Sequence, residues 1–226
     1  MKNKFKSLYF DCKNLLFESI NPFFKERFKD KDFINDLVSL KKNGVLIKDS
    51  FFDTNVIDEI NSYLDDNIKN SEFTKYNEVD GKSYNCVNSQ PFTLHYNFIN
   101  FATNDFLVNL VKSYFRRNKI YLSDSSYEIL PPSEINEGSY KWHFDLRGLQ
   151  IKAMVLLTDV DINGQYFTYI KGSHCFRSSL KDNNSRFSND YISKKFDKKE
   201  IVNCFSKKGS LIIFDSRGLH KGTRQN

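Results

Sequence analysis

The second half of the chain is interrupted too often by turn residues to form long helices. Short apolar runs alternate with turns, as where Asp161-Ile162-Asn163-Gly164 separates an apolar run over Leu149–Val160 from an aromatic run over Gln165–Ile170. Such short runs bounded by Gly and Asn predict strands, and we expect the first to be buried. Many short strands without a helical period favour two packed sheets. We therefore expect a mainly β chain with a double-stranded β-helix core, a jelly roll of the cupin-like kind.

The first half of the chain carries helical patterns instead. Apolar residues recur at helical spacing over Asp32–Lys42, and Gly44 is a predicted C-cap. Asp53 is a predicted N-cap for a helix from Thr54 to about Asn70. We expect these N-terminal helices to pack on one face of the core. Further elements are predicted as helices at Lys13–Ser19 and Asp105–Arg117, and as strands at Val45–Ile47, Ile120–Leu122 and Tyr127–Leu130.

The length of 226 residues is compatible with one domain, and 22 Phe and 12 Tyr supply large side chains for its core. No repeat or linker suggests a second domain. We expect a single domain over 1–226, mainly helical over 1–75 and forming the jelly roll over about 90–226.

The segment Lys141-Trp142-His143-Phe144-Asp145 carries the strongest chemical signal. Side chains alternate faces along a strand, so His143 and Asp145 point the same way. His220, in Gly218-Leu219-His220-Lys221-Gly222, is the natural third ligand. Two imidazoles and one carboxylate on one side of a metal leave its other side open, as in the facial triad of non-haem iron(II) oxygenases. We predict His143, Asp145 and His220 as metal ligands and catalytic residues.

A His-x-Asp motif alone is weak evidence, because it also arises by chance from a half-buried strand histidine and a surface acid. The two remaining histidines have structural interpretations. We expect His95 to be a packed or hydrogen-bonded strand histidine within Phe92–Tyr96, and His174 to support the structure without binding the metal. Trp142 and Phe144 should face away from the ligands.

The ordered motifs resemble those of the phytanoyl-CoA dioxygenase (PhyH)-like family of Fe(II)- and 2-oxoglutarate-dependent oxygenases. The resemblance covers about residues 120–226 and extends weakly to Val38–Leu64. The matching segments are Trp142–Asp145, Leu157–Asp161, Asn163-Gly164, Gly172–His174 and Phe214–Gly222.

The resemblance implies a dioxygenase that uses Fe(II), 2-oxoglutarate and O2 to hydroxylate a small or conjugated metabolite, releasing succinate and CO2. In related iron halogenases a small residue replaces the carboxylate ligand. Asp145 is present here, so hydroxylation is the expected reaction.

The resemblance also implies an arginine that binds the far carboxylate of 2-oxoglutarate, a geometry that suits a guanidinium. Arg224 is the only arginine after His220. The arginine of the family usually lies further on, and we expect the natural chain to continue beyond Asn226. Lys152 and Tyr140 are further candidates for co-substrate contacts. The poor arginine match leaves an alternative open, a catalytically silent jelly-roll protein that binds a metal or another ligand.

The net charge of +6 equals the excess of Lys and Arg over Asp and Glu in residues 171–208. This basic segment is either a solvated, flexible loop or a surface that steers an anionic substrate. No stacking platform accompanies it, so we expect no nucleic acid partner. Four scattered cysteines, no signal peptide and no apolar run long enough to span a membrane indicate a cytoplasmic protein. The sequence does not predict an oligomeric state.

Overall fold

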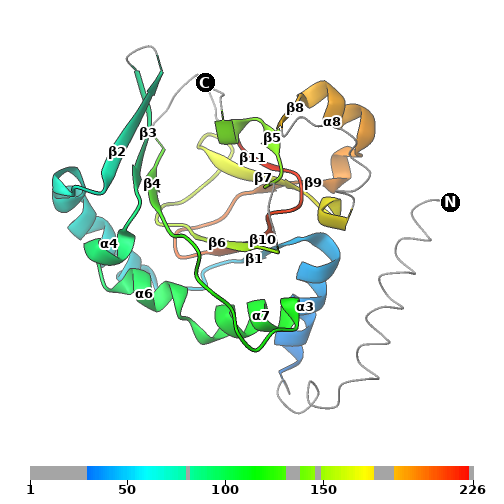
Figure 1. The fold of residues 1–226 in the computed structure, drawn as a ribbon, viewed down its shortest axis with the longest axis horizontal. Helices are drawn as coiled ribbons and strands as arrows, with labels where there is room; N and C mark the ends of the chain where they lie inside the picture. Colours follow the sequence, from blue (N-terminus) through cyan, green and yellow to red (C-terminus); the bar gives the residue numbers. More distant parts are fainter. Residues whose placement is uncertain (1–29, 80–81, 131–137, 146–148, 176–185, 224–226) are drawn as a thin grey trace.

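The computed structural model describes residues 30–79, 82–130, 138–145, 149–175 and 186–223. Its centre is a pair of antiparallel sheets that face each other (Figure 1). One has three strands, in the order β1 (Val45–Lys48), β10 (Leu211–Asp215) and β6 (Ile151–Val155). The other has five, in the order β8 (Arg186–Phe187), β5 (Trp142–His143), β11 (His220–Thr223), β7 (Tyr166–Ile170) and β9 (Ile201–Cys204). The expected mainly β, jelly-roll class is confirmed.

The two sheets share one core. Val45, Ile212 and Phe214 of the three-stranded sheet pack against Tyr169 and Cys204 of the five-stranded sheet. Strand β10 is buried along its whole length because it lies between β1 and β6 in the sheet and is also covered on its outer face. Removing this apolar surface from water supplies the main driving force that holds the sheets together.

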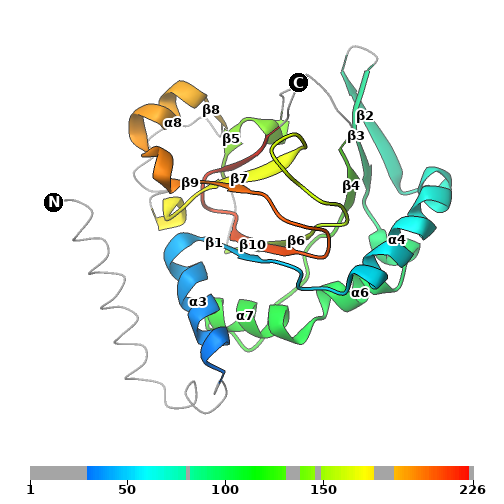
Figure 2. The same cartoon turned by 180° about the vertical axis from the view of Figure 1, so that it is seen from behind.

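Helices cover the outer face of the three-stranded sheet, as the sequence predicted (Figures 1 and 2). Leu37 and Leu40 of α3 (Lys31–Asn43) and Leu110 of α7 (Asp105–Phe115) pack against Leu211 and Ile213 of β10. Asp30 caps the start of α3 through its side chain, and Gly44 ends it with a φ of 77° that favours glycine.

A second group of helices extends this layer. Asp53 caps α4 (Thr54–Asn67), which is followed by a 3-10 turn, η1, over Ile68–Asn70. Ile57, Ile60 and Leu64 of α4 pack with residues of the short helices α5 (Pro91–Leu94) and α6 (Asn97–Ala102). The predicted helix at Lys13–Ser19 lies outside the described residues.

A third antiparallel sheet stands beside the core (Figure 1). Its strands are β2 (Thr74–Val79), β3 (Lys82–Asn88) and β4 (Tyr127–Ile129). On the opposite side of the molecule, α8 (Asn189–Lys195) covers the outer face of the five-stranded sheet (Figure 2). Trp142, Phe144 and Ile192 are buried there together, so the two aromatic residues face away from His143 as expected.

Three predictions about local structure are wrong. Ile120–Leu122 is not a strand, and Tyr121 is 89% exposed. His95 follows α5 and precedes α6, so it is not a strand histidine, although it does pack against Tyr96. Residues 171–208 are not one flexible loop, since the described part includes β8, α8, β9 and two 3-10 turns, η3 (Ser173–Cys175) and η5 (Lys198–Glu200).

The predicted buried strand at Leu149–Val160 also differs from the structure. Only Ile151–Val155 forms a strand, β6, and it lies at the edge of its sheet within the described part of the chain. Lys152 and Ala153 are exposed, and among the described strands only β10 pairs with β6. No helix among the described residues has the length and apolar character needed to cross a bilayer.

Candidate metal centre

His143 and His220 are direct partners in the pairing of β5 with β11. Their ring centroids lie 4.3 Å apart, and both side chains are buried. Strand pairing brings together two residues that are 77 positions apart in the sequence. The backbone register therefore sets the distance between the two imidazoles.

Asp145 lies two residues beyond His143, just after β5 ends. Its backbone N–H donates to the carbonyl of Ser216 at 2.9 Å, which holds the segment beside the turn that leads into β11. This keeps the carboxylate on the same face as His143, as the alternation of side chains predicts.

The three side chains converge. One ligand atom from each of His143, Asp145 and His220 lies within 4.8 Å of the other two. In the part of the chain that the structure describes, no other group of three His, Cys, Asp or Glu side chains meets this closely. The spacing suits atoms that share a single ion.

Both imidazoles are oriented by backbone carbonyls. His143 Nδ1 lies 2.8 Å from the carbonyl oxygen of Lys141, and His220 Nδ1 lies 2.8 Å from that of Gly218. A carbonyl only accepts, so each Nδ1 carries the proton and donates. Each Nε2 is then left with a lone pair, which is the arrangement that metal-binding histidines adopt.

The charge states also suit a divalent cation. Burial lowers the pKa of His143, and burial together with the neighbouring His143 lowers the pKa of His220 to about 4. Burial alone would raise the pKa of Asp145, but Lys152 and the two histidines outweigh it and hold that pKa below its ordinary value. At neutral pH the site therefore presents two neutral imidazoles and one carboxylate.

Lys152 is the fourth group at this centre. Its Nζ lies 2.9 Å from Asp145 Oδ2 as an ion pair, with the lysine side chain 44% exposed. Asp145 Oδ2 is buried, and this ammonium neutralises it and helps to keep it anionic. An anionic carboxylate oxygen beside two neutral imidazoles is the kind of donor that a divalent cation binds. The donor set of two nitrogens and one oxygen suits Fe(II) among the first-row metals.

The sequence also predicted Tyr140 and Arg224 as contacts of the co-substrate. Tyr140 is buried in the 3-10 turn η2 (Gly138–Tyr140). Its ring packs on the backbone of Gly222, where an added Cβ would lie 2.9 Å from two ring carbons. Gly222 shares the face of His220, so Tyr140 lies on the metal-centre side of β11. Arg224 lies outside the described residues.

Aromatic rings that the sequence analysis did not single out surround His220. The ring centroids of Phe214, Phe167 and Tyr169 lie 5.1, 5.7 and 6.4 Å from that of His220. They come from β10 and β7, and they shield one side of the imidazole from water. The alternation of side chains along Gln165–Ile170 predicts that Phe167 and Tyr169 share one face of the strand. It does not reveal that this face meets His220.

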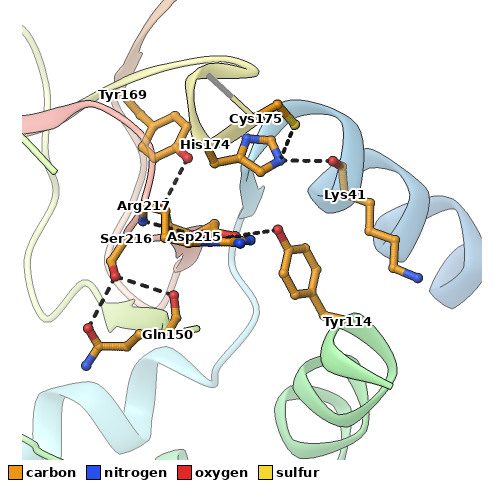
Figure 3. Close-up of polar contacts among 9 residues, drawn as sticks. All are labelled: Lys41, Tyr114, Gln150, Tyr169, His174, Cys175, Asp215, Ser216 and Arg217. Atoms are coloured by element: carbon orange, nitrogen blue, oxygen red, sulfur yellow. Dashed lines mark hydrogen bonds and ion pairs between the residues drawn. The ribbon is translucent and has the colours of Figure 1, made fainter. Parts of the chain in front are cut away.

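A buried polar network holds the turn before β11 (Figure 3). Asp215 is fully buried, and it accepts hydrogen bonds from Arg217 Nε at 2.9 Å and from the Tyr114 hydroxyl at 2.6 Å. Burial opposes ionisation of Asp215, but these two donors keep its pKa below the ordinary value. The Tyr169 hydroxyl donates to the Asp215 carbonyl at 2.9 Å. Tyr114 comes from α7, 101 residues earlier, so no local pattern predicts its role.

His174 lies at the edge of this network and not at the metal centre (Figure 3). It is buried, and its Nε2 hydrogen-bonds the carbonyl of Lys41 in α3 at 3.1 Å. The structural interpretation of His174 agrees with this placement. Its contact ties the turn after β7 to the helical layer.

Comparison with known proteins gives likenesses of fold. No family model matches the sequence, and no curated protein does. The non-heme alpha ketoglutarate dependent carbocyclase SnoK from nogalamycin biosynthesis is 12% identical, with a TM-score of 0.64 over 88% of this chain and 79% of that one. EctD from S. alaskensis with bound Fe is 15% identical, with a TM-score of 0.60 over 84% of this chain and 70% of that one.

A third solved structure is HygX from Streptomyces hygroscopicus with nickel, 2-oxoglutarate and hygromycin B bound. It is 15% identical and has a TM-score of 0.54 over 84% of this chain and 81% of that one. At such low identity these likenesses establish the fold alone.

Proposed function

We propose that this chain is an Fe(II)- and 2-oxoglutarate-dependent dioxygenase. The observation that carries the proposal is the convergence of one ligand atom each from His143, Asp145 and His220 within 4.8 Å. The fold shared with SnoK, EctD and HygX supports it, because SnoK is alpha ketoglutarate dependent, EctD binds Fe, and HygX binds nickel and 2-oxoglutarate.

In this proposal His143 Nε2, Asp145 Oδ2 and His220 Nε2 hold the ion. When bound, Fe(II) with 2-oxoglutarate and O2 would supply the oxidation, in which one oxygen atom enters a substrate C–H bond and the other enters succinate as CO2 leaves. The chain would fix the two imidazoles through the carbonyls of Lys141 and Gly218. Phe167, Phe214 and Tyr169 would keep water from His220.

We further propose Lys152 as a partner for a carboxylate of 2-oxoglutarate. A cation at Asp145 Oδ2 would replace the ammonium of Lys152, which now neutralises that oxygen. A lysine released from one carboxylate is suited to bind another. Tyr140 and Arg224 remain proposed contacts, Tyr140 because it packs beside β11 on the face of His220.

The finer assignment follows the sequence motifs. We propose a PhyH-like hydroxylase, cytoplasmic and built as one domain, acting on a small or conjugated metabolite. An anionic substrate is favoured by the basic segment 171–208. Because Asp145 supplies a carboxylate ligand, hydroxylation is proposed over halogenation.

The test measures succinate released by the full chain supplied with Fe(II), ascorbate, 2-oxoglutarate and a panel of candidate metabolites. Slow succinate formation without substrate, increased by one member of the panel, is the expected result. His143→Ala should abolish it, whereas His95→Ala, which removes a histidine that is not part of the triad, should preserve it. Equal succinate release from wild type and His143→Ala would refute the proposal.

One observation favours a second candidate, a catalytically silent binding protein. The ammonium of Lys152 occupies the Asp145 oxygen that an ion would need. Calorimetry with the inert analogue N-oxalylglycine separates the two functions. Metal-dependent binding supports the enzyme. Absence of binding with Fe(II) or Ni(II) present, together with absence of succinate, supports the silent protein.

A further inference from the structure

A cleft of about 550 Å³ lies on the outer face of the five-stranded sheet, beside α8. Figure 2 shows α8 over this end of the sheet. The polar side chains that line it include Asn189 of α8, Asn203 of β9, Thr168 of β7, and Lys221 and Thr223 of β11. The volume falls within the range of small-molecule sites, about 300–1,000 Å³.

This cleft is separate from the metal centre. Neighbouring residues on a strand face opposite sides of a sheet, so Lys221 points away from the face that carries His220. Trp142, which lines the cleft, is likewise turned away from His143. None of the residues that form the triad lines the cleft.

Lys221 places a positive charge in the cleft without a negative partner. The side chain is half-buried, its Nζ lies 5.2 Å from the centre of the Trp142 ring, and it lies 3.5 Å from Asn189 Oδ1. Within the described residues, no carboxylate is in ion-pair range of Lys221. Asp197 also lines the cleft, but its carboxylate pairs with Lys199 at 3.2 Å. A partly desolvated ammonium without a counter-charge favours binding of an anion.

The two asparagines that line the cleft, Asn189 and Asn203, add hydrogen-bond donors to it. Asn189 Oδ1 accepts from Trp142 Nε1 at 3.0 Å, and Asn203 Oδ1 accepts from the Thr168 hydroxyl at 3.2 Å. Both amide oxygens are therefore engaged inside the protein. Their NH2 groups have no partner among the described residues and remain available as donors. An ammonium and two amide NH2 groups lining one cleft match the acceptor oxygens of an oxyanion.

We propose that this cleft binds a small anionic metabolite through its phosphate or carboxylate group. The ammonium of Lys221 neutralises the anion, and Asn189 and Asn203 donate hydrogen bonds to its oxygens. The proposal does not depend on the metal centre, and it holds whether or not the chain is an oxygenase.

The chain contains a single tryptophan, Trp142, which lines the cleft and serves as the reporter. The experiment titrates the metal-free full chain with inorganic phosphate, and separately with acetate, at constant ionic strength, and follows tryptophan fluorescence. A saturable change with at least one of the two oxyanions is expected. Lys221→Gln should weaken that binding about tenfold or more, a loss of about 1.4 kcal/mol. Lys221→Arg should retain it.

Two matched variants separate the cleft from general charge effects. Lys194→Gln removes the same charge from an exposed position on α8, and Lys152→Gln removes the cation of the metal-centre face. Both should bind the oxyanion as the wild type does. The proposal is overturned by no saturable change with either anion, by equal binding in Lys221→Gln, or by loss of binding in Lys152→Gln. Thermal unfolding of each variant verifies that it is folded.

Discussion

His143 and His220 face each other as register partners across β5 and β11, with ring centroids 4.3 Å apart. The spacing of the two imidazoles is therefore a property of the strand pairing. A shift of the register by one residue would replace His220 with Lys221 at this face. The turn that precedes β11 fixes the register, and the network around Asp215 fixes that turn.

Removal of any triad side chain should weaken metal binding strongly. His220→Ala and Asp145→Ala each delete one donor, and we expect a loss of affinity for Ni(II) larger than the roughly 10–100-fold cost of losing a supporting residue. Calorimetry on the full chain measures this affinity. His95→Ala is the control, because His95 lies outside the triad. Wild-type affinity in both triad variants would mean that the ion binds elsewhere.

Lys152→Met should leave the affinity for Ni(II) at least as high as in wild type and should raise the KM for 2-oxoglutarate. The variant removes the ammonium that pairs with Asp145 Oδ2, so Ni(II) should bind at least as tightly as to wild type. If Lys152 also contacts 2-oxoglutarate, the KM for 2-oxoglutarate should rise about tenfold or more, a loss of roughly 1.4 kcal/mol or more.

The control for this variant is Lys208→Met, which removes an ammonium paired with Asp58 away from the centre. An unchanged KM for 2-oxoglutarate in Lys152→Met would show that Lys152 neutralises Asp145 and does not contact 2-oxoglutarate.

The Asp215 network should contribute more to stability than surface ion pairs do. Asp215→Asn leaves the half-buried guanidinium of Arg217 without its counter-charge, so we expect a loss of about 2–4 kcal/mol in the free energy of unfolding. Tyr114→Phe removes one hydrogen bond to a charged group and should cost about 1–3 kcal/mol. Urea unfolding measures both.

Lys207→Gln provides the comparison, because it breaks an exposed ion pair with Asp159 and should cost less stability than either Asp215→Asn or Tyr114→Phe. Similar losses of unfolding free energy in all three variants would show that the buried network contributes no more to stability than an exposed ion pair.

Gly218→Ala should disturb both stability and the metal centre. An added Cβ would lie 1.9 Å from the Tyr169 hydroxyl oxygen and 2.9 Å from Ser173 Oγ, so the turn has to move. Overpacking of this kind costs about 1–3 kcal/mol. The carbonyl of Gly218 orients His220, so Ni(II) affinity should fall as well.

Gly164→Ala is a matched change in a turn with more room, where a Cβ meets no atom closer than 3.7 Å. Its stability and Ni(II) affinity should stay near those of wild type. A Gly218→Ala variant that matches it in both measurements would contradict the close packing.

The metal-free protein should lose stability as the pH falls from 6.5 to about 4. Burial lowers the pKa of His220 from 6.5 to about 4, so between these values the unfolded chain binds the proton and the folded chain does not. The free energy of unfolding then falls with pH by up to about 3 kcal/mol from this residue.

His220→Gln should flatten that part of the profile, measured by urea unfolding in the presence of a chelator. The burial of His143 and His174 lowers their pKa values too, so some slope should persist. An identical profile in wild type and His220→Gln would contradict the buried, neutral state of His220.

Elements with strong local signals could be predicted from the sequence. The helical stripe, the N-cap Asp53 and the C-cap Gly44 each act within a few residues, so the bounds of α3 and α4 follow from local chemistry. The alternation at His143 and Asp145 and the motif around His220 singled out the candidate ligands in the same way.

Properties that depend on sheet order could not be predicted. Leu149–Val160 has the composition of a buried strand, yet β6 lies at an edge, because burial depends on which strands stand beside it. The contact of Tyr114 with Asp215 joins residues 101 positions apart, and no local pattern records it.

The sequence alone determined which side chains can bind a metal and which segments form the capped helices, because those properties depend on side-chain chemistry and short-range spacing. Only the tertiary structure decided that His143 and His220 meet at 4.3 Å, that Lys152 pairs with Asp145, and that Lys221 lies in a separate cleft. These distances arise from strand register and sheet packing, which join segments far apart in the chain and leave no local trace in either one.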